Sequence, residues 1–133
     1  PQAVYGTSKL AGEEFVENNC SKYYIFRTAW LYGDGHNFVK TMIEASKTHD
    51  VVTVVNDQHG SPTYAVDLAS IIHQAIEKDI PYGVYNSTNI GYITWYDFTK
   101  MIYELEGIKT EVKPVSGRIT YYGATYLLNT IAK

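Results

Sequence analysis

Tyr5 and Lys9 are the first residues along the chain whose types and spacing could do chemistry. Because they stand four residues apart, they share one face of a helix, one turn from each other. A free phenol has a pKa near 10, about three units too high for efficient proton exchange at neutral pH, and a nearby ammonium lowers that value. Such a pair could donate a proton to a carbonyl oxygen. The same spacing is also frequent on solvated helix faces, so the pair alone is a weak signal.

The elements that must position this pair alternate between helices and strands, which predicts the α/β class. Helices are expected at about 6–18, 38–47, 67–77 and 94–106, and strands at about 23–32, 51–55, 84–88 and 111–115. The stretch 23–32 is crowded with aromatic and β-branched residues, which favours a largely buried strand. Asn37 and Thr94 are suitable helix N-caps, and Gly107 is expected to end the last helix.

The composition fits one modest globular domain: 133 residues, 45% hydrophobic and 19% charged. A net charge of −3 gives no basic field for nucleic acid or an anionic membrane surface. Cys20 is the only cysteine, which fits a reducing compartment, and four scattered histidines suggest no metal cluster. No apolar run approaches membrane-spanning length, and no signal peptide is recognised. We therefore expect a cytoplasmic protein with no metal, no nucleic acid and no membrane partner.

One expected feature of a nucleotide-binding α/β domain is missing. Such domains carry a glycine-rich turn after the first strand. Neither G-x-G-x-x-G nor G-x-x-G-x-x-G occurs in this sequence. The part of such a domain that binds cofactor phosphates is therefore expected to lie outside this chain.

Several motifs together resemble the extended short-chain dehydrogenase/reductase family, most closely its dTDP-4-dehydrorhamnose reductase branch. They are YGTSKLAGE, RTAWLYG, NFV, DQHGSPT and GVYNSTNIGYITWYDF, and they cover residues 1 to about 115 in the family's order. The resemblance implies the C-terminal part of a longer reductase. Residues 1–33 would be the catalytic helix and following strand of a Rossmann-like NAD(P)-binding fold, and residues 34–133 the smaller substrate-binding α/β domain. The first helix and strand would then leave apolar surface exposed, and a homodimer is one way to cover it.

The resemblance also implies roles for particular residues. Hydride would pass from NADPH or NADH to the C4 ketone of a deoxysugar nucleotide, while Tyr5 protonates the forming alkoxide. Lys9 would promote that proton transfer and hold the nicotinamide ribose, and Thr28 and Ala29 would pass the nicotinamide carboxamide. The residues implied for the nucleotide-sugar substrate are Trp30, Asn37, Phe38, Gln58 and Thr63.

Structural alternatives stand beside several of these roles. Trp30 could be a core residue, and Asn37 could be only a helix cap. Arg27 could contact substrate or belong to a buried ion pair. Trp95 is interpreted as packing on an amphipathic helix, and no role is assigned to His59.

Two other functions fit the same motifs. The first is a nucleotide-sugar epimerase or dehydratase of the extended family, which would share Tyr5 and Lys9. The second is a non-catalytic relative that binds a partner enzyme as a regulatory subunit. The family's C-terminal Arg-Pro pair is not matched, because Arg118 has no proline beside it, and residues 126–130 are at best a diverged version of the stretch that follows. A pyrophosphate contact is therefore not assigned to Arg118.

Overall fold

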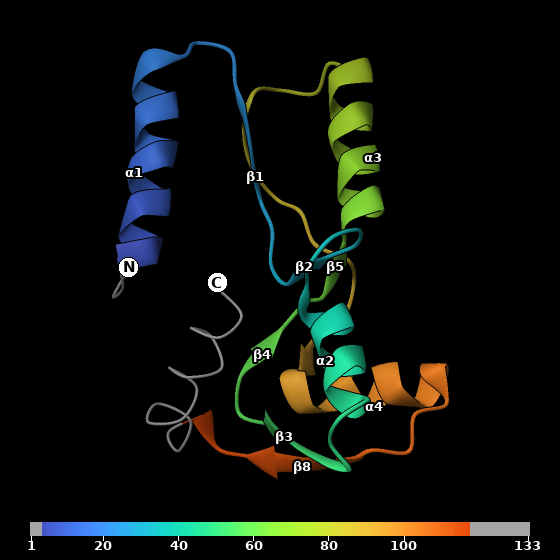
Figure 1. Cartoon of the computed structure of the whole chain (residues 1–133). Coiled ribbons are helices and arrows are strands. Elements are labelled where there is room, and N and C mark those ends of the chain that lie inside the picture. Colours follow the sequence, from blue (N-terminus) through green and yellow to red (C-terminus); the bar gives the residue numbers. More distant parts are fainter. Residues whose placement is uncertain (1–3, 118–133) are drawn as a thin grey trace.

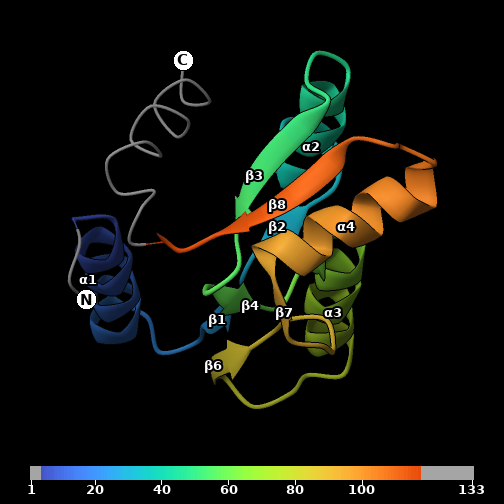
Figure 2. The ribbon, with the colours of Figure 1, turned by 90° about the horizontal axis from the view of Figure 1, so that it is seen from below.

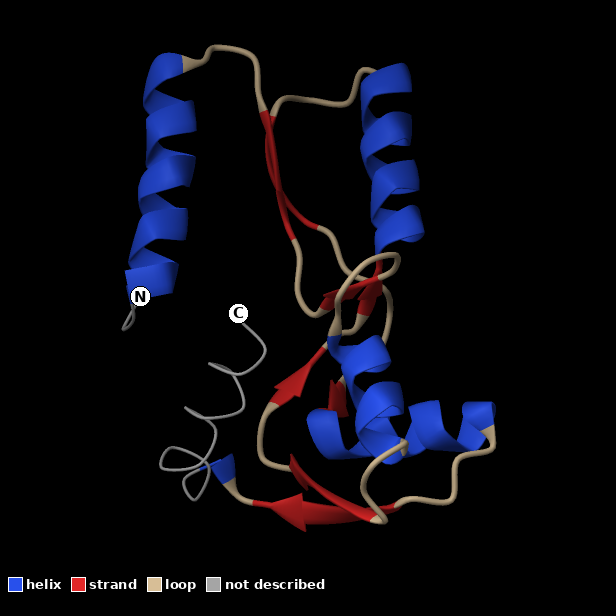
Figure 3. Cartoon of the chain, in the orientation of Figure 1, coloured by secondary structure: helices blue, strands red, loops and turns tan. Residues whose placement is uncertain are grey.

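The computed structural model describes residues 4–117, which form an alternating α/β structure (Figures 1 and 3). The first half contains α1 (Val4–Asn19), β1 (Tyr24–Arg27), β2 (Leu31–Tyr32), α2 (Phe38–Ser46), β3 (Val51–Val55), β4 (His59–Gly60) and β5 (Thr63–Tyr64). The second half contains α3 (Ala65–Glu77), β6 (Gly83–Asn86), β7 (Ile93–Thr94), α4 (Trp95–Glu106) and β8 (Glu111–Val115). Arg118 and residues 126–130, singled out in the sequence, lie outside the described residues.

The strands associate in pairs that join distant parts of the chain. Three pairs are parallel, β1 with β6, β2 with β5, and β3 with β8, whereas β4 and β7 run antiparallel. Parallel strands need long crossovers, and here helices lie in those crossovers. Across the described residues no helix is both long and apolar enough to cross a membrane.

The core lies where α2 and α4 cover one face of the β3–β8 pair (Figure 2). Its buried residues are Met42, Val54, Phe98, Ile102 and Tyr103. The Tyr103 hydroxyl donates a 2.8 Å hydrogen bond to the Met42 carbonyl oxygen, which ties α4 to α2. The core is therefore built from α2, β3 and α4, and no residue of α1 belongs to it.

Local sequence signals set the ends of α4 as predicted. The Thr94 hydroxyl accepts a 3.0 Å hydrogen bond from the Asp97 amide, which satisfies an otherwise unpaired donor of the first turn. The helix ends at Gly107, whose φ of +66° is left-handed and suits glycine. Asn37 likewise caps α2, since its side-chain oxygen accepts from the Lys40 amide at 3.2 Å.

A second layer is formed by β1 and β6, which lie between α1 and α3 (Figure 1). No residue of α1 is buried, and the Phe15 side chain is 68% exposed. An ion pair between Arg27 and Glu13 joins the helix to β1. The apolar surface that the sequence led us to expect on the first helix is therefore exposed.

The prediction of one buried strand over 23–32 is wrong. The segment forms two short strands, β1 and β2, and none of their residues is buried. Between them Trp30 adopts a φ of +47°, a left-handed conformation that a strand cannot contain. The backbone therefore changes direction at Trp30.

Candidate functional site

Tyr5 and Lys9 lie together on the first turns of α1. The Lys9 Nζ atom is 5.6 Å from the centroid of the Tyr5 ring, and the Tyr5 side chain is 74% exposed. The phenol and the ammonium therefore share one face of the helix, as their spacing predicts, and both can be reached by a ligand.

The path of the chain brings this pair to the end of the β1–β6 layer at which β1 has its carboxyl terminus. Helix α1 runs antiparallel to β1, so its first turn and the carboxyl end of β1 lie at the same end (Figure 1). Ligands of open parallel α/β sheets bind outside the carboxyl ends of the strands. Thr28 and Ala29 follow β1 directly at this end, with Thr28 exposed and Ala29 half-buried.

Arg27 is held by a carboxylate of α1. Its Nη2 atom lies 2.6 Å from Glu13 Oε2, and its Nε atom donates to both carboxylate oxygens at 3.0 and 3.1 Å. The Arg27 guanidinium, through this hydrogen bonding, holds the pKa of the Glu13 carboxyl below its usual value. Of the two alternatives for Arg27, the structure therefore contains the ion pair, but on an exposed surface instead of a buried one.

Trp30 and Phe38 meet around a third ring, that of Trp95. The Trp30 and Trp95 rings are stacked, with centroids 3.4 Å apart and planes at 13°. The Phe38 ring lies 4.3 Å from the Trp95 ring, tilted by 46°. Two residues implied for substrate binding thus touch a residue that the sequence assigned to packing.

Asn37 has all parts of its amide engaged in the loop before α2. Besides accepting from Lys40, the amide nitrogen donates to the carbonyl oxygens of Gly33 at 2.7 Å and Gly35 at 3.0 Å. The capping alternative for Asn37 is confirmed. A contact of its side chain with substrate would require these bonds to be exchanged, and that role stays a prediction.

The DQHGSPT segment places its predicted residues in different surroundings. Gln58 is exposed, whereas Thr63 is fully buried and donates its hydroxyl to the Ser61 carbonyl oxygen at 3.1 Å. Asp57 accepts from the Ser116 hydroxyl at 2.7 Å and from the Gly117 amide at 2.8 Å. Asp57 therefore ties this loop to the residues that follow β8.

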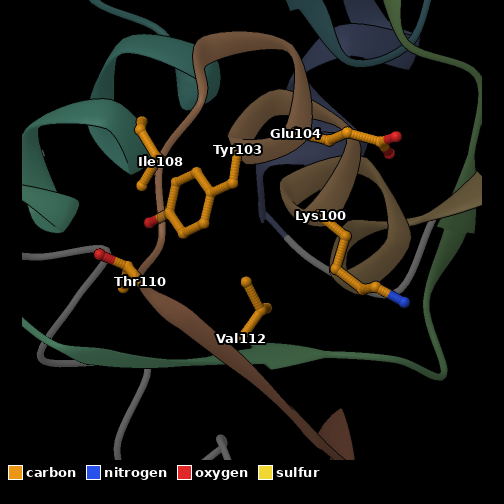
Figure 4. Close-up of a pocket in the computed structure, with 6 residues that line it drawn as sticks. All are labelled: Lys100, Tyr103, Glu104, Ile108, Thr110 and Val112. Atoms are coloured by element: carbon orange, nitrogen blue, oxygen red, sulfur yellow. The ribbon is translucent and has the colours of Figure 1, made fainter.

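Figure 4 shows a pocket that lies elsewhere, between α4 and the segment leading into β8. Its lining residues are Lys100, Tyr103, Glu104, Ile108, Thr110 and Val112. None of the residues predicted for the site lines it, so it is not the candidate site. Within residues 4–117, no three His, Cys, Asp or Glu side chains gather as ligands for a metal ion.

Sequence reasoning missed Trp95 and Gly60. The N-cap Thr94 explained why a helix starts before Trp95, but nothing local indicated that its ring would stack on Trp30. From the sequence, Gly60 indicates only a constrained turn in the DQHGSPT segment. In the structure its Cα lies against the Trp30 indole, so closely that a Cβ atom would overlap the ring.

An exposed Tyr–Lys pair at the start of a helix that runs antiparallel to a parallel strand pair, followed by an α/β domain with its own core, fits the end of a Rossmann-like fold and its substrate-binding part. Comparisons with known proteins agree with this assignment. Residues 1–124 match the model of the RmlD substrate binding domain. The chain belongs to this family, and the resemblance and the fold class inferred from the sequence are confirmed.

Individual relatives of this chain are dTDP-4-dehydrorhamnose reductases. The chain is 41% identical over 109 residues to dTDP-4-dehydrorhamnose reductase of Salmonella typhimurium, covering 78% of this chain and 36% of that protein. It superposes on a crystal structure of a dTDP-4-dehydrorhamnose reductase from Clostridium acetobutylicum with a TM-score of 0.85 at 52% identity, covering 87% of this chain and 41% of the other. A Bacillus anthracis dTDP-4-dehydrorhamnose reductase in complex with NADP also gives a TM-score of 0.85, at 46% identity, covering 89% and 42%.

The chain thus spans about two fifths of the length of the relatives it matches. The boundary between residues 1–33 and 34–133 stays a prediction.

Proposed function

We propose that this chain is the substrate-binding part of an NAD(P)H-dependent dTDP-4-dehydrorhamnose reductase. The whole enzyme would reduce the C4 ketone of dTDP-4-dehydro-L-rhamnose to the alcohol of dTDP-L-rhamnose, a cytoplasmic step that supplies surface-polysaccharide synthesis. Family membership and the two reductase structures at 46% and 52% identity support this activity. The NADP complex of one of those relatives favours NADPH over NADH.

The chemistry divides between cofactor and protein. The nicotinamide supplies a hydride to C4. The Tyr5 hydroxyl supplies the proton that the C4 oxygen needs as its negative charge develops, and the resulting phenolate regains a proton from solvent. Lys9 places a positive charge beside the Tyr5 ring, 5.6 Å from its centroid, where it can stabilise the transition state for proton transfer. Its ammonium can also donate to ribose hydroxyls.

The residues of this chain fit such a cofactor at the carboxyl end of β1. Tyr5 and Lys9 are exposed there, and the backbone of Thr28 and Ala29 follows the strand where a nicotinamide carboxamide could find hydrogen-bonding partners. The single observation that carries the proposal is the meeting of the exposed phenol with the Lys9 ammonium on α1, close to that end. Trp30, Asn37, Phe38, Gln58 and Thr63 are the residues that we assign to the nucleotide sugar.

Tyr5→Phe in the full-length enzyme tests the proposal. Loss of a general acid lowers kcat by about 10²–10⁴-fold, and the KM for NADPH should change little. Tyr82→Phe is the matched control, because Tyr82 lies just before β6, away from the strand's carboxyl end. Activity is followed as NADPH oxidation with dTDP-4-dehydro-L-rhamnose. If Tyr5→Phe turned over as fast as Tyr82→Phe, Tyr5 would not be the proton donor; conversion of the sugar without NADPH oxidation would favour an epimerase.

A further inference from the structure

The backbone of Trp30 is held in a conformation that tryptophan rarely adopts. Its φ of +47° is in the left-handed region, where a bulky residue is an outlier. Such a conformation persists only where its surroundings impose it. One restraint is the 3.1 Å hydrogen bond from the amide of the fully buried Thr63 to the Trp30 carbonyl oxygen.

The Trp30 ring is fixed from two further sides. Trp95 stacks on it with centroids 3.4 Å apart. Gly60 lies against the indole atoms around Nε1. A Cβ atom built on Gly60 would be 2.7 Å from Nε1 and 2.8 Å from Cζ2, and closer still to Cε2. These are distances that real Cβ atoms do not show, so any other residue at position 60 would displace the ring.

Gly60 is required here for space and not for its backbone freedom. Its φ is not among the positive values of the described glycines. Its strand is also fixed, because Gly60 in β4 pairs with Ile93 in β7, two residues before Trp95. Gly60 therefore lies in β4, and Trp95 directly follows the paired strand β7. The two residues restrain the same indole together.

Trp95 also links Trp30 to the start of α2. Its ring packs against Phe38 at 4.3 Å, so one side chain contacts two of the residues assigned to the nucleotide sugar. Movement of Trp95 would disturb both at once.

We propose that Gly60 and Trp95 are positioning residues that hold the Trp30 indole where it orients the sugar of the nucleotide-sugar substrate. The inference rests on the proposed reductase function. Gly60 acts by leaving room for the ring, and Trp95 acts by stacking on it. Neither needs to touch the substrate.

The first test measures ring geometry without any enzyme activity. Trp30 and Trp95 are the only two tryptophans of the chain, and closely stacked indoles give a coupled pair of bands of opposite sign in circular dichroism. Trp95→Phe removes the pair of bands, and Gly60→Ala reduces it strongly. Gly12→Ala is the matched control, since a Cβ atom there meets nothing within 4 Å, and it leaves the bands unchanged. Undiminished bands in Gly60→Ala would overturn the role of Gly60.

The second test uses the full-length enzyme with dTDP-4-dehydro-L-rhamnose. Displacing a group that orients a substrate by about 1 Å can cost about a hundredfold in rate. Gly60→Ala and Trp95→Leu should therefore lower kcat/KM for the sugar nucleotide by about that factor, with an unchanged KM for NADPH. Trp95→Phe should keep most of the wild-type kcat/KM because it keeps a flat ring. Tyr96→Phe, the neighbouring control, should leave kcat/KM unchanged.

The outcomes separate the inference from the function on which it rests. Wild-type enzyme that reduces the sugar, together with variants at positions 60 and 95 that match it in kcat/KM, would overturn the positioning role alone. Wild-type enzyme without reductase activity would overturn the proposed function, and the sugar-orienting role with it, whatever the dichroism shows. A fall in kcat/KM accompanied by an equal rise in the KM for NADPH would indicate general loss of structure and also contradict the proposal.

Discussion

The hydroxyl of Tyr103 ties α4 to α2 inside the core, and the loss of stability on its removal can be predicted quantitatively. The side chain is 3% exposed, and its hydroxyl donates to the Met42 carbonyl oxygen at 2.8 Å. Tyr103→Phe keeps the ring and its packing but deletes this bond. A buried neutral hydrogen bond contributes about 0.5–1.5 kcal/mol net, and a carbonyl left without its donor adds to the loss, so we expect the free energy of unfolding to fall by about 1–1.5 kcal/mol.

Urea unfolding of the chain at pH 7, followed by far-UV circular dichroism, measures this loss. With a slope of about 1–1.5 kcal/mol per molar, the midpoint should fall by about 1 M with the slope unchanged. Tyr96→Phe is the control: it makes the same chemical change on α4, at a half-buried ring that faces the Lys100 ammonium. Should Tyr103→Phe lose no more stability than Tyr96→Phe, the hydrogen bond would not be stabilising the core.

The pH dependence gives an independent check of the same burial. Burial raises the pKa of Tyr103 above its ordinary value of 10.0. A group whose pKa is raised by folding gives stability that is full below the unfolded pKa and is lost as the pH rises through the folded pKa. As the pH rises above about 10, the wild-type chain should therefore lose more stability than Tyr103→Phe. Both keep the contribution of Tyr24, whose pKa is also raised, mainly by burial, so equal alkaline losses would contradict the account.

Three smaller predictions concern a helix start, a helix end and an ion pair. Thr94→Ala removes the oxygen that accepts from the Asp97 amide and should cost about 1 kcal/mol in urea unfolding, with Thr94→Ser recovering most of it. Gly107→Ala has free space for its Cβ atom, so its cost of about 1 kcal/mol should come from the φ of +66° alone; no loss would mean that the backbone relaxes. In Arg27→Gln, the Glu13 pKa followed by NMR should rise toward its ordinary value of 4.5. Since the pair lowers that pKa in the folded state, its stabilisation is present above about 4.5 and is lost as the pH falls through the folded value, a loss that Arg27→Gln should not show.

The parts of the fold that could be predicted from the sequence are those set by neighbouring residues. The cap at Thr94, the left-handed Gly107 and the cap at Asn37 each depend on contacts within a few residues. The same is true of Tyr5 and Lys9, whose meeting follows from helix periodicity. The assignment of their chemistry came from the family resemblance, because the spacing itself is common.

The interruption of the strand at Trp30 could not be predicted, because distant residues impose it. The residues from 23 to 32 favour extended structure, whereas contacts with the later positions 60, 63 and 95 hold Trp30 in its left-handed conformation. Sequence periodicity contains no information about such contacts. For the same reason Trp95 was interpreted as ordinary helix packing.

Failures of local prediction of this kind are expected where function requires strain. A Trp30 that continued the strand would point its ring according to the pleat, with nothing to select one orientation of a sugar. The left-handed turn releases the ring from the sheet, and the stack on Trp95 together with the bare Cα of Gly60 then restrains it again in a single position. The proposed substrate-binding residue therefore has a fixed orientation before any substrate arrives. If the strain served only packing, a variant that relaxed it would be more stable and equally active; on the present account, relaxation of Trp30 lowers kcat/KM for the sugar nucleotide whatever it does to stability.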